Sequence, residues 1–167
     1  LAGQSNMEGH ANVRTFGYIG EDPETKPLLD LMTDDAGNPV TAERVWVSNT
    51  TEFFKTQGTV SGKLTAGLGA RQKPSELGNN IGPEYTFGLK MQQHYDGPIL
   101  IIKTAWGGKS LHTDFRPPSA GPYTLNGWQK EVYPTQEGHG IPKDFAQWKI
   151  DKKAATGVYY RKMVDHV

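Results

Sequence analysis

The stretch IGPEYTFGLKMQQHYDGPILII, residues 81–102, decides the fold class. Pro83 stands at an early helical position and Glu84 in the first turn, where these residue types are preferred in a helix. The sequence Asp-Gly-Pro at 96–98 ends that helix. The continuous apolar run at 99–102 is typical of a strand that is buried on both faces of a parallel sheet. A helix, a tight turn and a buried strand together predict a layered α/β fold.

The pattern is weaker outside this stretch. Residues 1–2 resemble the end of a first strand, and residues 45–47, Val-Trp-Val, are a short strand candidate. Residues 57–80 are rich in glycine and predict a long surface loop. Residues 112–150, rich in proline, glycine and aromatic residues, predict a second irregular segment. A final helix is expected from about Ala154.

The composition excludes several classes of function. The 167 residues carry 18 Lys and Arg against 18 Asp and Glu, so no net charge favours nucleic acid or an anionic membrane. The absence of cysteine excludes disulfides, thiolate metal sites and a cysteine nucleophile. No run of about 18 apolar residues could span a bilayer. The triplet Asn49-Thr50-Thr51 matches a glycosylation acceptor, although such triplets often arise by chance.

Two glycine-containing segments, residues 3–9 and 107–111, follow the predicted strands. Ligands of open α/β sheets bind beyond the carboxyl ends of the strands, so both segments are candidates for the site, each at an expected helix N-terminus. The first segment also holds a hydroxyl, that of Ser5. A serine nucleophile needs a base, donors for the developing oxyanion and access for its substrate. The backbone N–H of Ser5 and that of Gly107 or Gly108 could supply such donors.

The run Gly-Gln-Ser-Asn-Met at 3–7 resembles the first conserved block of the SGNH hydrolases. The specific similarity is to the branch of sialate O-acetylesterase-like proteins and carbohydrate esterase family 6, which includes acetylxylan esterases. Residues 82–84, Gly-Pro-Glu, together with residues 87–88, Phe-Gly, resemble the helix start of that branch. Residues 103–111, KTAWGGKSL, resemble its second block. The resemblance covers most of residues 1–111.

The resemblance implies a flavodoxin-like three-layer α/β/α sandwich with a parallel sheet, in an enzyme that removes acetyl groups from carbohydrates. Ser5 would be the nucleophile, and the N–H groups of Ser5 and of Gly107 or Gly108 would form the oxyanion hole. The family also needs a third block with an Asn or Gln oxyanion donor, and a C-terminal Asp-x-x-His. Neither occurs in the sequence. Asp165-His166 lacks the required spacing and is not assigned as the catalytic pair.

We therefore expect residues 1–167 to be the N-terminal part of a single SGNH hydrolase domain, incomplete at both ends, lacking the C-terminal blocks and inactive alone. The expected parent is a bacterial serine esterase, extracytoplasmic or secreted, that acts on an acetylated carbohydrate without cofactor or metal. No histidine pair has metal-ligand spacing. Two alternatives stay open, a non-catalytic carbohydrate-binding or structural protein of the same fold and an SGNH lipase or thioesterase. Met7 stands where a Gly-x-Ser-x-Gly elbow needs glycine, which disfavours an ordinary α/β-hydrolase.

Five residues near the two blocks are candidates for substrate contact: Gln4, Asn6, Glu84, Trp106 and His112. Gln4 and Asn6 either orient the nucleophile loop or satisfy its backbone. Glu84 is most simply a first-turn helix carboxylate, and His112 follows the second block closely enough to line the pocket.

Aromatic side chains crowd the predicted irregular segment: Phe115, Tyr123, Trp128, Tyr133 and Trp148. They form either a platform for sugar rings or an anchor between the loop and the core. The run at 116–118, Arg-Pro-Pro, is expected to make that segment rigid.

Overall fold

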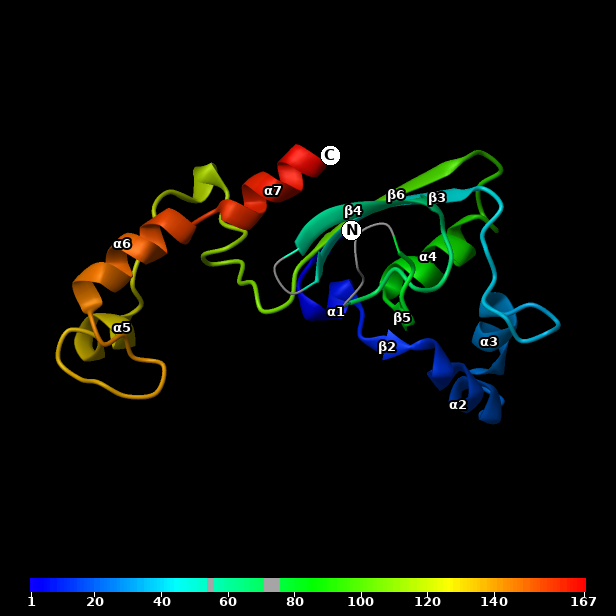
Figure 1. Ribbon diagram of the computed structural model, residues 1–167, viewed down its shortest axis with the longest axis horizontal. Helices are drawn as coiled ribbons and strands as arrows, with labels where there is room; N and C mark the ends of the chain where they lie inside the picture. The colour runs from blue at the N-terminus through cyan, green and yellow to red at the C-terminus, as the bar shows by residue number, and fades with distance from the viewer. Residues whose placement is uncertain (54–55, 71–75) are drawn as a thin grey trace. The chain divides into compact units, whose positions relative to one another are not determined.

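The computed structural model describes residues 1–53, 56–70 and 76–167. The chain divides into two compact units, residues 1–108 and 109–167, which are treated separately (Figure 1). None of the helices in these described ranges is long and apolar enough to cross a membrane.

The first unit contains a four-stranded sheet in the order β1-β6-β3-β4. Strands β1, β6 and β3 run parallel to one another, whereas β4 is antiparallel to β3. The strands of this sheet are β1 (Ala2–Gly3), β3 (Val45–Phe53), β4 (Thr56–Lys63) and β6 (Ile99–Ala105). Two short antiparallel strands form a separate pair: β2 (Ala11–Asn12) and β5 (Asn80–Ile81). The mostly parallel sheet confirms the predicted α/β class.

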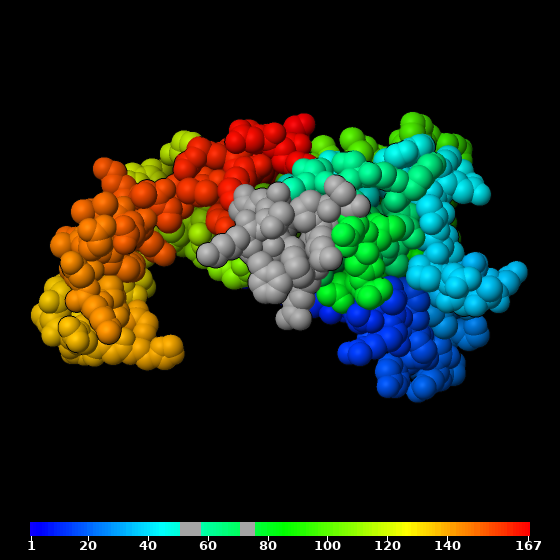
Figure 2. Space-filling model, viewed as in Figure 1, coloured from blue at the N-terminus to red at the C-terminus, as the bar shows by residue number. Residues whose placement is uncertain are grey.

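Helices α1 and α4 pack against β6, and α2 and α3 pack against each other (Figure 1). The blue atoms of α2 and α3 lie next to one another in the space-filling view (Figure 2). The helical segments of this unit are α1 (Ser5–Glu8), the 3-10 helix η1 (Val13–Thr15), α2 (Phe16–Glu21), α3 (Lys26–Met32) and α4 (Pro83–Met91). The helix predicted from residues 81–84 is therefore confirmed as α4.

The core of this unit lies between α4 and one face of the sheet. Tyr85 and Leu89 on α4 have no exposed surface, and Val45 and Ile101 supply the strand side of the contact. Gly88 lets the helix approach closely, because a Cβ at this position would stand 2.9 Å from Cδ1 of Ile101. Each large apolar side chain buried here contributes about 1.5–3 kcal/mol to stability.

Two sequence-based expectations for this unit are wrong. Leu100 is 63% exposed, so β6 is not buried on both faces. Residues 57–80 are not one long loop, because β4 pairs with β3 along its whole length, from Trp46 opposite Lys63 to Phe53 opposite Thr56. Residues 64–70, which follow β4, contribute several buried side chains to the core. Residues 71–75 of the expected loop lie outside the described ranges.

Residues 112–150 are irregular over most of their length, as expected, but this part of the second unit also contains helices. The helices of the second unit are the 3-10 helix η2 (Pro118–Ala120), α5 (Gly127–Val132), α6 (Phe145–Ala155) and α7 (Val158–His166). The final helix expected from about Ala154 corresponds to α7, whereas α6 before it was not expected. The two helices are separated at Gly157, whose φ of +72° interrupts the helical backbone. Asp165-His166 stands at the end of α7.

The aromatic residues of the second unit pack mainly against one another. Tyr133 meets Trp148 edge to face with ring centroids 5.1 Å apart, and Tyr123 contacts the same indole at 6.2 Å. Trp128 also contacts Tyr133, yet it is 54% exposed. These contacts all lie within the second unit, so the anchor to the core and the sugar platform both stay predictions. Arg116 holds the segment as expected, because its guanidinium donates to the carbonyls of residues 120 and 121.

Candidate active site

The site begins where two parallel strands end side by side. Gly3 of β1 is paired with Ala105 of β6, and the N–H of Trp106 donates to the Gly3 carbonyl over 3.1 Å. Ser5 and Gly107 each stand two residues beyond this pair. The structure thus brings the two predicted segments together at the carboxyl edge of the sheet, where ligands of α/β proteins bind.

Ser5 opens the short helix α1 at the start of a tight turn, residues 4–9, here called the nucleophile turn after the role predicted for Ser5. The Glu8 N–H donates to the Gln4 carbonyl over 2.8 Å, and the Gly9 N–H donates to the Ser5 carbonyl over 3.0 Å. The Ser5 N–H is one of the first N–H groups of the helix, which have no acceptor within it. The backbone therefore leaves this donor available, as an oxyanion hole requires.

Glycines at both ends make the turn possible. A Cβ at Gly3 would stand 2.7 Å from Cβ of Met7, so no side chain fits where the turn folds back. Gly9 has φ +88°, and a Cβ there would stand 2.5 Å from the nitrogen of Gly82. The nucleophile turn therefore rests with its backbone directly against the segment that begins α4.

Gly107 and Gly108 form an exposed turn after β6. A Cβ at Gly107 would stand 2.8 Å from Oε2 of Glu8, so this glycine allows the second segment to approach the nucleophile turn. Gly108 has φ +72°, a conformation that favours glycine. The expected helix N-terminus at 107–111 is wrong, because the chain forms turns there.

A cavity of about 470 Å³ opens beside the nucleophile turn. Its wall includes Ser5, Asn6, His10, Gly82 and Thr86. Sequence reasoning did not select His10, whose Nε2 lies 3.8 Å from Oε2 of Glu8. The imidazole is half exposed and the carboxylate mostly covered. A ligand in this cavity would therefore meet a serine hydroxyl, an amide and an imidazole.

Beneath the turn lies a buried ion pair that sequence reasoning also missed. Nζ of Lys103 lies 2.6 Å from Oε2 of Glu84, and their side chains are 1% and 0% exposed. The same ammonium donates to the carbonyls of Glu8 and Leu68, each over 2.9 Å. The other carboxylate oxygen accepts from the Gly82 N–H over 3.0 Å. Burial lowers the pKa of Lys103, and the attraction of Glu84 opposes that shift.

The remaining predicted residues are placed less directly. Glu84 has no exposed surface with which to touch a substrate, and Trp106 is only 4% exposed. Gln4 is exposed and contributes its carbonyl to the turn. His112 belongs to the second unit, where Nε2 lies 3.2 Å from the Thr124 carbonyl. Direct substrate contact by these four residues stays a prediction, one that burial disfavours for Glu84 and Trp106.

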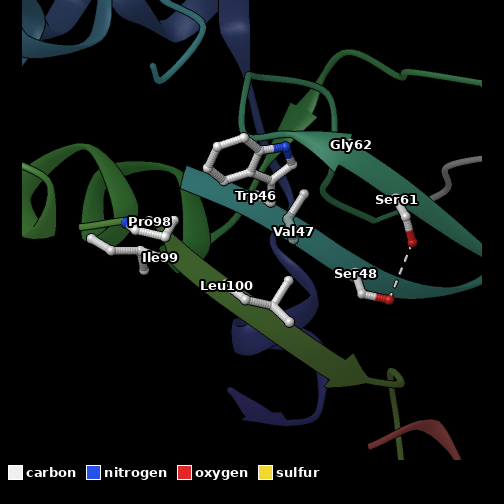
Figure 3. Close-up of a pocket in the computed structure, with 8 residues that line it drawn as sticks. All are labelled: Trp46, Val47, Ser48, Ser61, Gly62, Pro98, Ile99 and Leu100. Carbon is white, nitrogen blue, oxygen red and sulfur yellow. Dashed lines mark hydrogen bonds between the residues drawn. The ribbon is translucent and has the colours of Figure 1, made fainter. Parts of the chain in front are cut away.

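A second cavity, of about 490 Å³, lies over the exposed face of the sheet (Figure 3). Trp46 and Leu100 point into it from β3 and β6, and the hydroxyls of Ser48 and Ser61 are hydrogen-bonded over 3.2 Å. Its wall contains none of the predicted catalytic residues. Within the described ranges, no group of three or more His, Asp or Glu residues is arranged to hold a metal ion.

Comparison with known families identifies the first unit and the start of the second. A family model described as carbohydrate esterase, sialic acid-specific acetylesterase matches residues 1–132. The chain belongs to this family. It is an esterase family of acetylated carbohydrates, which confirms the resemblance read from residues 3–7 and 103–111. No curated protein and no solved structure matched the chain.

Proposed function

We propose that Ser5 is the nucleophile of a carbohydrate O-acetylesterase that works through an acetyl-enzyme. Ser5 Oγ loses its proton to a base and attacks the acetyl carbonyl carbon. The resulting oxyanion is held by the N–H of Ser5 and that of Gly107 or Gly108. Collapse of this intermediate breaks the ester bond and releases the sugar oxygen, which takes the proton from the base. Water then hydrolyses the acetyl-enzyme by the reverse use of the same groups.

The observation that carries the proposal is the pairing of Gly3 with Ala105. Because of this pairing, Ser5 and the exposed turn at Gly107 each follow the end of one of two neighbouring strands, β1 and β6. Ser5 also lines an open cavity, so a substrate has access to it. Loss of one oxyanion donor typically costs about 3–4 kcal/mol in catalysis, so correct placement of this pair matters.

We further propose that the base comes from an Asp-x-x-His motif outside residues 1–167, and that these residues form the N-terminal part of one SGNH hydrolase domain. None of the five histidines has an aspartate three positions before it. No Asp-x-x-His motif within these residues is therefore available to accept the Ser5 proton.

Fluorophosphonate labelling of the full-length protein tests Ser5. We expect one label, mapped to Ser5 by peptide mass spectrometry and lost in Ser5→Ala. Ser61→Ala is the matched control, because Ser61 is an exposed serine on β4, and it should label like the wild type. Absence of label from the folded wild type would refute the nucleophile and favour a non-catalytic carbohydrate-binding protein.

The acyl group is tested by comparing acetyl with octanoyl esters of one alcohol. A preference for acetyl is expected. A preference for octanoyl would instead identify an SGNH lipase or thioesterase.

A further inference from the structure

The ammonium of Lys103 joins three separate segments to β6. It contacts the end of the nucleophile turn at Glu8, the loop after β4 at Leu68, and the first turn of α4 at Glu84. A lysine ammonium has three donors, and these three acceptors use all of them. The position of Nζ is therefore fully determined by its surroundings.

We propose that Lys103 is a positioning residue for Ser5, acting through the carbonyl of Glu8, and that Glu84 holds the ammonium at that carbonyl. This inference rests on the proposed role of Ser5. The Glu8 carbonyl lies in the last turn of α1, where carbonyls receive no N–H donor from within the helix. A charge-assisted bond of 2.9 Å to this group restrains the turn more strongly than a neutral donor would.

Glu84 acts on the opposite side of the same contact. Its Oε1 accepts from the Gly82 N–H, and the Gly82 backbone is the surface on which Gly9 rests. A Cβ at Gly82 would stand 3.0 Å from Nζ of Lys103, so the ion pair lies directly against this backbone. The pair thus restrains both the turn that carries Ser5 and the segment that supports it.

Stability alone does not require an ion pair here. Replacement of both members of a buried ion pair by well-packed apolar residues of similar volume is often neutral or stabilising, whereas removal of one member is strongly destabilising. A purely structural role therefore predicts that a neutral double replacement restores the reactivity of Ser5 together with most of the stability. A positioning role predicts that it restores folding but not the reactivity of Ser5.

The variants are Lys103→Met, Glu84→Gln and the double variant with both changes, in the full-length protein. We expect the melting temperature to fall in Lys103→Met and to recover in part in the double variant, where the carbonyls of Glu8 and Leu68 still lack the ammonium donor. Labelling of Ser5 by a fluorophosphonate should stay slower by between about 10- and 100-fold in the double variant, the range expected for a misplacement of up to about 1 Å. The loss should appear in kcat for an acetyl ester, with KM little changed.

An exchange measurement reads the turn without relying on catalysis. The N–H groups of Glu8 and Gly9 close the nucleophile turn, and their hydrogen exchange should be about tenfold faster in the double variant. The N–H of Gln92 donates a hydrogen bond to the Gly88 carbonyl at the end of α4, and it should exchange at the wild-type rate. If wild-type Ser5 fails to label, the proposed function fails, and this exchange comparison still decides the inference.

A chemical rescue completes the test. The chain has no cysteine, so Lys103→Cys introduces its only thiol within residues 1–167. Aminoethylation of the unfolded variant followed by refolding restores an ammonium on a side chain of lysine length, with the wild type taken through the same cycle as control. Recovery of both labelling and slow exchange supports the inference. Full Ser5 reactivity and slow exchange in the neutral double variant would overturn it.

Discussion

Replacement of Gly9 by alanine tests how closely the nucleophile turn rests on the start of α4. Gly9 has φ +88°, and the added Cβ would stand 2.5 Å from the nitrogen of Gly82 and 2.5 Å from the carbonyl oxygen of Ile81. All of these neighbours are backbone atoms, so no side chain can rotate away. The two segments must separate by about 1 Å to reach ordinary van der Waals contact.

The magnitude follows from the bonds that such a separation breaks. With φ +88° and ψ 109°, the Gly9 backbone lies outside even the left-handed helical region, so its conformation costs a residue with a side chain at least about 1–2 kcal/mol. The Gly9 carbonyl accepts a hydrogen bond from the Ala70 N–H over 2.6 Å, and the Gly9 N–H donates to the backbone carbonyl of Ser5 over 3.0 Å. Each such bond contributes about 0.5–1.5 kcal/mol. Gly9→Ala should therefore destabilise the first unit by about 3 kcal/mol.

Gly37→Ala is the matched control, because Gly37 has φ +79° and no atom within 4 Å of an added Cβ. It likewise places a side chain at positive φ, but without the overlap, and should cost about 1 kcal/mol. Urea unfolding followed by circular dichroism measures both free energies of unfolding. Gly9→Ala should also slow the labelling of Ser5, and Gly37→Ala should not. Equal destabilisation by the two substitutions would refute the close backbone contact.

Two further predictions concern Tyr85 and the cap of α5. Burial raises the pKa of Tyr85 from its ordinary value near 10 to about 12. The neutral phenol therefore contributes stability below pH 10, and this contribution, about 3 kcal/mol in all, is lost as the pH rises towards 12. Tyr85→Phe should remove this loss of stability at high pH. It should also cost about 1–2 kcal/mol at pH 7, because the carbonyls of Met32 and Val40 lose the hydroxyl as their donor. Urea unfolding at pH 10–12 measures the loss, and an unchanged loss in Tyr85→Phe would contradict this reasoning. Asn126 caps α5, because its side chain accepts a hydrogen bond from the Gln129 N–H over 2.8 Å. Asn126→Ala should therefore lower the stability of α5 by about 1 kcal/mol, whereas Asn126→Asp should not. Hydrogen exchange of the α5 amides measures this difference.

Local signals made α4 and β6 predictable. The proline and glutamate of residues 83–84 and the Asp-Gly-Pro at 96–98 act within a few residues of the boundaries they set. Strand β4 was missed because its signal is not local. It contains Gly58 and Gly62 and little apolar surface, and it becomes a strand through its ladder with β3.

The helices of the second unit carried signals that the prediction did not use. Asn126 and Gln129 form a capping box at α5, and Asp144 caps α6 by accepting from the Gln147 N–H. In both cases a capping residue is followed three positions later by glutamine, a recognised start signal. Gly157 likewise marks the boundary between α6 and α7.

The glycine segments of the site were predictable, but the ion pair beneath them was not recognised. Lys103 and Glu84 are 19 residues apart, so no spacing rule connects them. One clue was present in β6, where Lys103 alternates with the buried Ile101 and Ala105 and so shares their face of the strand. A lysine on the core face of a strand requires a buried partner, so its presence predicts a buried carboxylate close to it in the fold.

Asn49 of the triplet Asn49-Thr50-Thr51 is 2% exposed in β3 and donates to the Leu68 carbonyl over 3.1 Å. A glycan on the Asn49 amide is incompatible with the packing of β3, because the side-chain nitrogen to which it would be attached faces the interior. Glycosylation during secretion in a eukaryotic host would therefore act before folding, as a block to it. A folded preparation that carries a glycan on Asn49 would contradict this packing, and production in a bacterial host avoids the competition altogether.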